Sequence, residues 1–296
     1  MGFSTPQGTQ SRHDWWDKGI DAWERASRLN QAVLDIRNRD STRRALDKQN
    51  AQLYGDHRVF GYEFQPLPTR TRLTLNGIKS VTDNVVARVA RNPIRAVPQT
   101  YGGNHSLQRR ATLLGQYLDY AMEANDAATH MRLAFRDAAV FGTGFVYPYI
   151  EQTKVLVERI PPWEMLVDQN DGRMGAPRSL YRQKHLPREQ LNALFPKKQE
   201  EVMRASDVDR NDLFLQTDSQ LDLVTVVEAW HLPSRPGKKD GRHCIATDKG
   251  VLVDELWEYD EFPIIPIRYS EPVYGFWGKG IAENLTPLQV ELNKNL

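Results

Sequence analysis

The sequence feature that most constrains the fold is a change of hydrophobic period at Gly142 and Gly144. Before these glycines, apolar residues recur every three or four positions, which predicts helices, and after them the period is two, which predicts strands. We expect both glycines to end a helix in a positive-φ conformation, which costs little only for glycine. Helices followed by strands predict an α+β fold and not alternating βαβ units.

Helical periodicity dominates the first half of the chain. An apolar stripe through Trp16, Ile20 and Trp23 predicts that residues 14–55 form an amphipathic helix. Pro93 should stop a second helix, and a short strand is expected at 94–99. The expected helices are 14–55, 73–92, 106–124 and 127–140, with Leu107, Leu114 and Leu118 of the third facing inward.

Period-two patterns bounded by proline and glycine predict antiparallel strands in the second half. The expected strands are 144–150, 154–160, 165–168, 179–186, 223–232, 244–247, 251–256 and 264–269. A short helix is expected at 187–195 and an exposed helix or loop at 197–222. Helical spacing returns at 280–296, so the chain reads as helices, then a sheet region, then one more helix.

Two features admit more than one interpretation. Trp15, Trp16 and Trp23 could stack on nucleobases or could be buried in a core or a subunit contact, and we favour burial. The net charge of the chain is +1, without the basic excess typical of nucleic-acid binders. Residues 65–110 nevertheless hold eight basic residues and one acidic residue. This segment could face phosphates, the acidic surface of a neighbour, or solvent.

The sequence offers no catalytic constellation, and we expect a chain that is not an enzyme and takes no cofactor or metal. The glycines at 142 and 144 follow a helix and precede a strand, which is the reverse of a dinucleotide-binding loop. Residues 168–172 fail the ligand spacing of a calcium loop and predict a turn. Asp254 and Glu255 are adjacent on a strand, so they point to opposite faces and cannot act as an acid–base pair.

Cysteine usage and hydropathy suggest where the protein is made. Cys244 is the only cysteine, so the chain can form neither an intrachain disulfide nor a cysteine-based zinc site. The seven histidines are scattered. The first residues lack the features of a secretory signal, and no apolar run approaches the roughly 20 residues that span a bilayer. We expect a soluble protein that is intracellular when made.

Four blocks, in this order, give the chain a resemblance to the phage portal family, the head-to-tail connectors of tailed bacteriophages. They are a helix and strand at 85–98, a helix ending in glycine at 134–146, the segment 157–164, and a glycine-containing segment at 276–285 that leads into the helical residues 287–293. The resemblance covers about residues 65–296. It implies N-terminal helices packed on an antiparallel, wing-like sheet region, followed by the start of a stem or channel helix.

The resemblance also implies a division of the chain. It gives a mainly helical wing part at 14–140, a β-rich wing part at 141–275 and the start of the channel helix at 276–296. Residues 1–13, which are polar and contain Gly, Pro and Ser, are expected to be a disordered lead-in. The clip, the rest of the stem and the crown of portal chains are then absent, so we expect either a truncated product or a continuation beyond residue 296.

The implied function is that of a structural subunit. Portal subunits form a ring of about a dozen copies at one capsid vertex. The ring conducts double-stranded DNA without sequence specificity, and it binds the terminase large subunit, capsid or scaffold proteins and head–tail adaptors. The candidate DNA-facing residues are Lys279 and Lys294, and the candidate subunit-contact residues are Trp16, Ile20, Trp23, Arg88 and Arg91. The alternatives are a tail adaptor or minor capsid component and, less favoured, a DNA-packaging enzyme.

Overall fold

The computed structural model describes residues 14–55, 75–92, 95–151, 154–208 and 221–295. Helices and two antiparallel sheets give the mixed α+β fold that the change of period predicts. The chain divides into two compact units whose segments alternate along the sequence. Unit 1 contains Met1–Asp40, Leu166–Asp171 and Pro177–Glu261, and unit 2 contains Ser41–Met165, Gly172–Ala176 and Phe262–Leu296.

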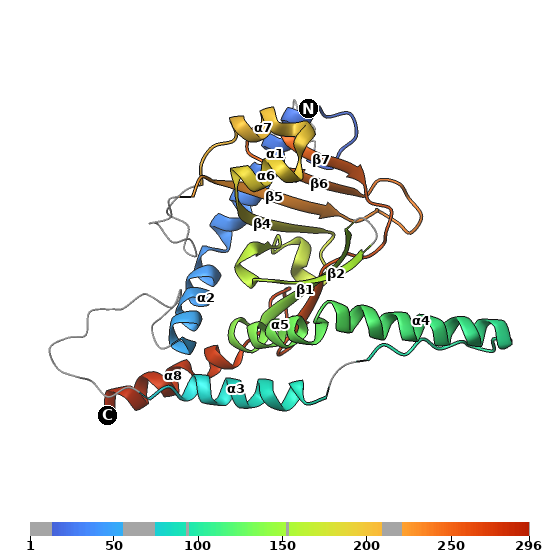
Figure 1. The fold of residues 1–296 in the computed structure, drawn as a ribbon. Helices are drawn as coiled ribbons and strands as arrows, with labels where there is room; N and C mark the ends of the chain where they lie inside the picture. The colour runs from blue at the N-terminus through green and yellow to red at the C-terminus, as the bar shows by residue number, and fades with distance from the viewer. Residues whose placement is uncertain (1–13, 56–74, 93–94, 152–153, 209–220, 296) are drawn as a thin grey trace, which may run out of the picture. The chain divides into compact units, whose positions relative to one another are not determined.

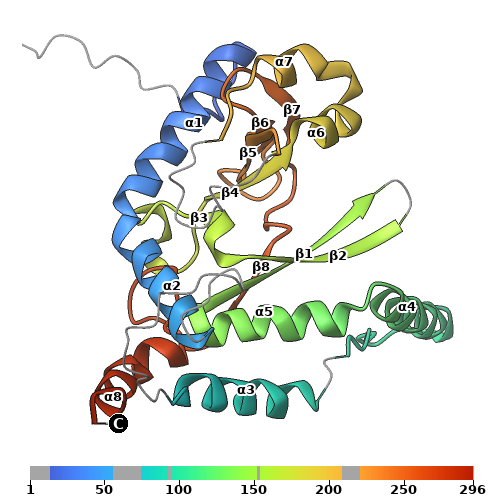
Figure 2. The ribbon, with the colours of Figure 1, turned by 60° about the vertical axis from the view of Figure 1, so that its left-hand side comes forward.

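Unit 1 is built on a sheet with the strand order β3-β4-β5-β6-β7 (Figures 1 and 2). These strands are β3 (Met165–Leu166), β4 (Ser179–Pro187), β5 (Leu223–His231), β6 (Arg242–Ala246) and β7 (Val251–Leu256). On β5, Val227 and Ala229 join a core with α1 (Ala22–Arg39), whereas Val224 and Val226 join a second core on the opposite face. Leu191 of α6 (Arg188–Leu194) and Val202 of α7 (Gln199–Arg204) complete that second core. Alternating side chains therefore bury both faces of the sheet under helices.

Residues 14–20 are not helical, and a buried arginine explains why. Arg25 is 1% exposed, and its guanidinium donates hydrogen bonds to three backbone carbonyls of the preceding loop. The acceptors are the carbonyls of Trp15, Asp17 and Ile20. Asp21 begins α1 by accepting a hydrogen bond from the backbone N–H of Glu24 at 2.7 Å. The helix expected over 14–55 is therefore a folded loop followed by two helices, α1 and α2 (Ser41–Tyr54).

Unit 2 combines a small sheet in the order β2-β1-β8 with a group of helices. Its strands are β1 (Thr143–Glu151), β2 (Lys154–Ile160) and β8 (Ile265–Arg268), and its helices are α2, α3 (Gly77–Ala90), α4 (His105–Ala124), α5 (Ala127–Phe141) and α8 (Ile281–Asn295). Helix α5 lies along the sheet and leads directly into β1, while α3 packs on the side of α5 away from the sheet (Figure 2). Val140 of α5 packs with Ile78 of α3 and Ala282 of α8.

In the described part of the chain, three short 3-10 helices connect these elements. They are η1 (Pro162–Glu164), η2 (Asp171–Met174) and η3 (Pro196–Lys198). The turn expected at residues 168–172 is present, because the carboxylate of Asp168 accepts hydrogen bonds from the backbone N–H groups of Asn170 and Asp171.

Two expectations for residues 95–124 are wrong. Residues 95–99 form no strand, and the expected residue 94 lies outside the described residues. Helix α4 is present, but it buries no side chain, and the expected inward residues Leu107 and Leu114 are 44% and 50% exposed. An amphipathic pattern shows that a face requires a partner, but it does not show that the partner belongs to the same chain.

A buried histidine links the strands β5, β6 and β7 of unit 1. His243 on β6 lies between Glu228 on β5, at 3.2 Å from Nε2 to Oε1, and Glu255 on β7, at 2.7 Å from Nδ1 to Oε1. Burial lowers the pKa of His243, but its hydrogen bonds to the two carboxylates outweigh burial and raise the pKa above 6.5. The imidazole therefore favours the cationic form, which bridges two anionic side chains.

This arrangement predicts that stability falls as the pH rises above neutrality. A pKa raised by folding gives stability that is complete below the unfolded value of 6.5 and is lost as the pH rises through the folded value. We expect the melting temperature to fall as the pH rises above 6.5, and His243→Gln to reduce this slope. His231, whose pKa is lowered to about 4, titrates below this pH range. Cys244, whose pKa is raised from 9.0 to about 12, titrates above it.

The control is His105→Gln, which replaces an exposed histidine of α4 and should keep the unmodified slope. An equal pH dependence in the His243→Gln chain and the unmodified chain would contradict the bridging role.

Candidate functional site

The segment from residue 276 to residue 295 is the candidate site, because it contains α8 and the residues expected to face DNA. Its first part lies directly on the junction of α5 and β1. Gly142 ends α5 with φ +92°, and a Cβ there would collide with the carbonyl oxygen of Gly278. A Cβ on Gly280 would lie 2.8 Å from the carbonyl oxygens of Ala139 and Val140. Only glycines allow these two backbones to approach so closely.

Gly144 is required for a different reason from the one the sequence suggests. It lies within β1 and has no positive φ, so the expectation of a special backbone conformation holds for Gly142 alone. A Cβ on Gly144 would instead collide with the carbonyl oxygen of Ala134 in α5. The residue is a glycine because helix and strand backbones touch at this point.

Polar and aromatic contacts hold the same junction. Thr143 Oγ1 accepts a hydrogen bond from the backbone N–H of Gly278 at 2.8 Å. The guanidinium of Arg43 lies 3.7 Å from the centre of the Trp277 ring, a cation–π contact within unit 2. Trp277 also meets Phe145 edge-on at 5.8 Å between ring centres. Residues 276–280 are therefore fixed before α8 begins.

A buried glutamine fixes the second half of α8. Gln289 is 6% exposed, and its Oε1 accepts hydrogen bonds from the backbone N–H groups of Gly77 at 2.7 Å and Ile78 at 3.3 Å. Its Nε2 donates to the carbonyl of Leu75, whose own N–H donates to Asn293 Oδ1 at 3.2 Å. The first N–H groups of a helix have no partner within that helix, so α8 supplies the partners for the start of α3.

The two lysines that are expected to face DNA do not both lie on α8. Helix α8 begins at Ile281, so Lys279 precedes it and only Lys294 belongs to it. Both are exposed and form local ion pairs, Lys279 with Glu283 at 3.5 Å and Lys294 with Glu291 at 3.4 Å. Their role towards DNA remains a prediction.

The expected subunit-contact residues lie in different surroundings. Trp16 is stacked on His231 with 4.0 Å between ring centres, Ile20 is half-buried, and Trp23 is 68% exposed. They do not form one helical stripe, since only Trp23 belongs to α1. Arg88 and Arg91, at the end of α3, are exposed. Trp15, considered as a stacking platform, is 2% exposed and belongs to the core of unit 1.

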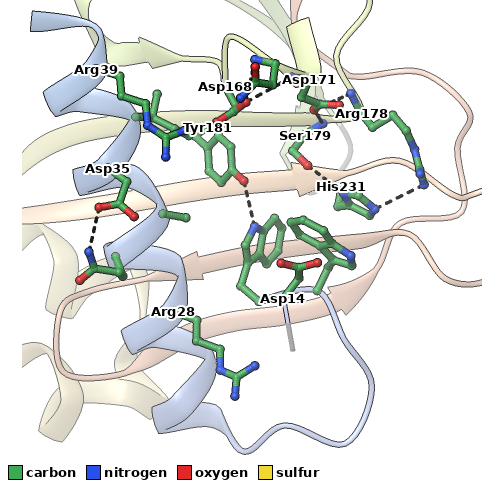
Figure 3. A pocket seen from close by; sticks show the side chains of 16 residues that line it. Asp14, Arg28, Asp35, Arg39, Asp168, Asp171, Arg178, Ser179, Tyr181 and His231 are labelled. Atoms are coloured by element: carbon green, nitrogen blue, oxygen red, sulfur yellow. Dashed lines mark hydrogen bonds and ion pairs between the residues drawn. The ribbon is translucent and has the colours of Figure 1, made fainter. Parts of the chain in front are cut away.

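A groove of about 1140 Å³ in unit 1 contains the arrangement nearest to a catalytic pair. Ser179 Oγ lies 2.8 Å from Nδ1 of His231, and Arg178 lies 3.4 Å from the other ring nitrogen (Figure 3). A guanidinium only donates hydrogen bonds, so Nε2 of His231 accepts and its proton resides on Nδ1, facing the serine. A general base needs the opposite tautomer. Burial and the charge of Arg178 also lower the pKa of His231 to about 4, so this pair is structural.

Other residues considered for chemistry are also engaged in structural contacts. Asp254 forms ion pairs with Arg242 at 2.6 Å and Arg25 at 3.2 Å, whereas Glu255 bonds to His243, so these adjacent acids are separated as expected. Within the described residues, no three His, Cys, Asp or Glu side chains gather so that they could hold a metal ion. Among the described helices, none has both the length and the apolar content of a membrane span.

The helix–glycine–sheet junction and the anchored terminal helix both lie within the part of the chain that matches a known protein family. A sequence model of the phage P22-like portal protein family matches residues 61–296, which is most of the chain. The chain therefore belongs to this family, which is a family of structural proteins and not of enzymes. The resemblance seen in the sequence from about residue 65 onwards is confirmed. A comparison with curated protein sequences found no match.

The residues that sequence reasoning missed are those whose partners are distant along the chain. Gly278 and Gly280 belong to a block that carries the family resemblance, but no local pattern shows what they touch. Gln289 gave a weak signal, because it continues the spacing of Ile281 and Leu285 on the buried side of α8 with a polar residue.

The glycine contacts lead to a test that separates backbone strain from collision. Gly142→Ala adds both and should destabilise the chain by about 2–5 kcal/mol, and Gly144→Ala adds collision alone and should cost about 1–3 kcal/mol. Gly237 has φ +78°, and a Cβ there would meet nothing within 4 Å. Gly237→Ala therefore isolates the strain and should cost about 1 kcal/mol. Free energies of unfolding measured in denaturant test this order. Equal values for Gly142→Ala and Gly237→Ala would show that the contact with Gly278 contributes nothing.

The Gln289 contact leads to a local prediction. Gln289→Ala leaves two N–H groups at the start of α3 without acceptors and should cost about 1–3 kcal/mol. Hydrogen exchange should accelerate at the amides of Gly77 and Ile78 and stay unchanged in α4. Glu291→Ala, on the exposed side of the same helix, is the matched control. Unchanged exchange at both amides in the Gln289→Ala chain would show that the hydrogen bonds to Gln289 do not stabilise the start of α3.

Proposed function

We propose that this chain is the structural subunit of a ring of about a dozen copies at one vertex of a phage capsid. Double-stranded DNA passes through the ring without sequence recognition. The observation that carries the proposal is the match to the portal family over residues 61–296. The protein then resides at the portal vertex of the virion, and in the host cytoplasm during assembly.

The anchoring of α8 supports its assignment as the start of the channel helix. A helix that lines a conduit must keep its position while DNA moves past it. Backbone contacts at Gly278 and Gly280 hold one end of α8, and the buried amide of Gln289 holds it further along. Three independent contacts therefore oppose sliding or rotation of this helix within unit 2.

The distribution of charge suits a conduit. Each tight phosphate contact adds affinity and salt dependence, so a channel through which DNA slides should have few of them. The net charge of +1 and the pairing of Lys279 and Lys294 with neighbouring glutamates are consistent with weak contacts. In a ring, each of these lysines is repeated around the axis, so that the equivalent lysines of all copies form a circle of positive charge.

The proposed partners follow from the same role. The ring binds the terminase large subunit during packaging, and later it binds head–tail adaptors. Capsid or scaffold proteins surround it at the vertex. Electron microscopy and mass photometry of the full-length protein test the assembly, and rings are the expected result. A full-length protein that is only monomeric at all concentrations contradicts the proposal.

The DNA contact has its own test. Lys279→Glu combined with Lys294→Glu places like charges beside Glu283 and Glu291, and it reverses the sign of the charge at both positions in every copy of the ring. We expect rings to form normally and the DNA packaged per procapsid to fall, with the defect larger at low salt. Lys238→Glu with Lys249→Glu, a double reversal on the surface of unit 1, is the control. Packaging at the unmodified level would show that the two lysines do not face the channel.

A further inference from the structure

Residues 95–124 form an arm that is attached to the rest of unit 2 mainly at one end. Its helix, α4, has 20 residues and so is about 30 Å long. It extends away from α5, and the preceding segment runs back along it (Figures 1 and 2). This segment, 95–100, lies beside the side of α4 that carries Gln108, Thr112, Gly115, Gln116 and Asp119.

The opposite side of α4 is apolar and exposed. Its large side chains are Leu107, Leu113, Leu114, Tyr117 and Tyr120, with exposures of 44%, 56%, 50%, 49% and 69%. They recur at helical spacing and so form one continuous face. Single exposed apolar residues are ordinary, but five on one face of a projecting helix mark an interaction surface.

The arm, together with the end of α3 that precedes it, also carries positive charge that the described residues leave unpaired. Between residues 88 and 110 there is no aspartate or glutamate, and five arginines have no ion-pair partner within the described part of the chain. These are Arg88, Arg91, Arg95, Arg109 and Arg110. The partner that fits such a surface is apolar and acidic.

The two units of this chain have opposite charge. Unit 1 has 19 basic and 24 acidic residues, a net charge of −5, and unit 2 has 20 and 14, a net charge of +6. Another copy of the chain therefore offers the arm a surface of the required sign. Contact between two arms is disfavoured, because it would bring Arg109 and Arg110 of one copy close to those of the other.

One loop of unit 1 has the required mixture of side chains. Residues 256–261, which begin at the last residue of β7, expose Leu256 at 48% and Tyr259 at 69%. Three acids accompany them, namely Glu258, Asp260 and Glu261. Lys239 pairs with Glu258 at 2.8 Å, whereas Asp260 and Glu261 have no ion-pair partner among the described side chains.

We propose that the arm of one copy docks on the 256–261 loop of unit 1 in a neighbouring copy. The contact is heterologous, because each copy uses two different surfaces, and such a contact can be repeated from copy to copy until a ring closes. Leucine and tyrosine side chains supply apolar area, and the arginines opposite Asp260 and Glu261 fix the orientation. This inference rests on the proposed function, in which copies of the chain form a ring.

Charge reversal tests the contact in the full chain. The arm variant carries Arg109→Glu and Arg110→Glu, and the loop variant carries Asp260→Lys and Glu261→Lys. Mass photometry should show assemblies for the unmodified chain and at least a tenfold loss of self-association for each variant. An equal mixture of the two variants should assemble again, because the intact arm meets the intact loop and the reversed arm meets the reversed loop in alternating copies. A chain with all four reversals should assemble again.

The control reverses an adjacent pair of lysines away from both surfaces, Lys197→Glu with Lys198→Glu, and should assemble normally. All substituted arm and loop residues are exposed, so unchanged circular dichroism is expected. Arm and loop variants that assemble like the unmodified chain overturn the contact and leave the proposed ring intact. An arm variant that loses DNA affinity but assembles normally shows that the arm faces nucleic acid. An unmodified chain that never associates contradicts both the ring and the contact.

Discussion

Direct contact between two peptide backbones, at Gly142 and Gly278, is the constraint on which unit 2 depends. The carbonyl of Gly142 also accepts a hydrogen bond from the N–H of Tyr269 at 3.1 Å, and Thr143 binds the N–H of Gly278. The end of α5, the start of β1, the end of β8 and the approach to α8 therefore meet within two residues. A side chain could adjust to a neighbour by changing rotamer, but two backbones in contact cannot, and so the geometry at this point is fixed.

The sequence predicted the elements around this junction well because their signals are local. The change from helical to strand period placed the end of α5 and the start of β1 within one residue, and β2 was predicted with its observed ends, Lys154 and Ile160. The reason for Gly144 was missed because the atom it avoids, the carbonyl oxygen of Ala134, lies ten positions away. The packing of two elements, and not the preference of the residue itself, determines such a glycine.

Other errors have the same origin in contacts distant along the chain or outside it. Periodicity through Trp16 predicts a helix, but the buried guanidinium of Arg25 satisfies the carbonyls of residues 15, 17 and 20 and stabilises a loop instead. For α4, the helix itself was predicted but the burial of Leu107 and Leu114 was not observed, since no described part of the chain covers them. Of the candidate site, the sequence indicated the segment 276–296 through its family resemblance, but no local pattern could show that Gly278 touches Gly142 or that Gln289 binds the start of α3.

The amide of Gln289 has a consequence for how this protein can vary among its relatives. A helix turns by about 100° per residue, so one residue inserted or deleted between Gly280 and Gln289 would move the amide off the start of α3 and present Leu288 or Val290 there. Surface loops tolerate changes in length because nothing downstream depends on their phase. The number of residues from Gly280 to Gln289 should therefore be constant in functional homologues, even where the exposed residues of this stretch differ.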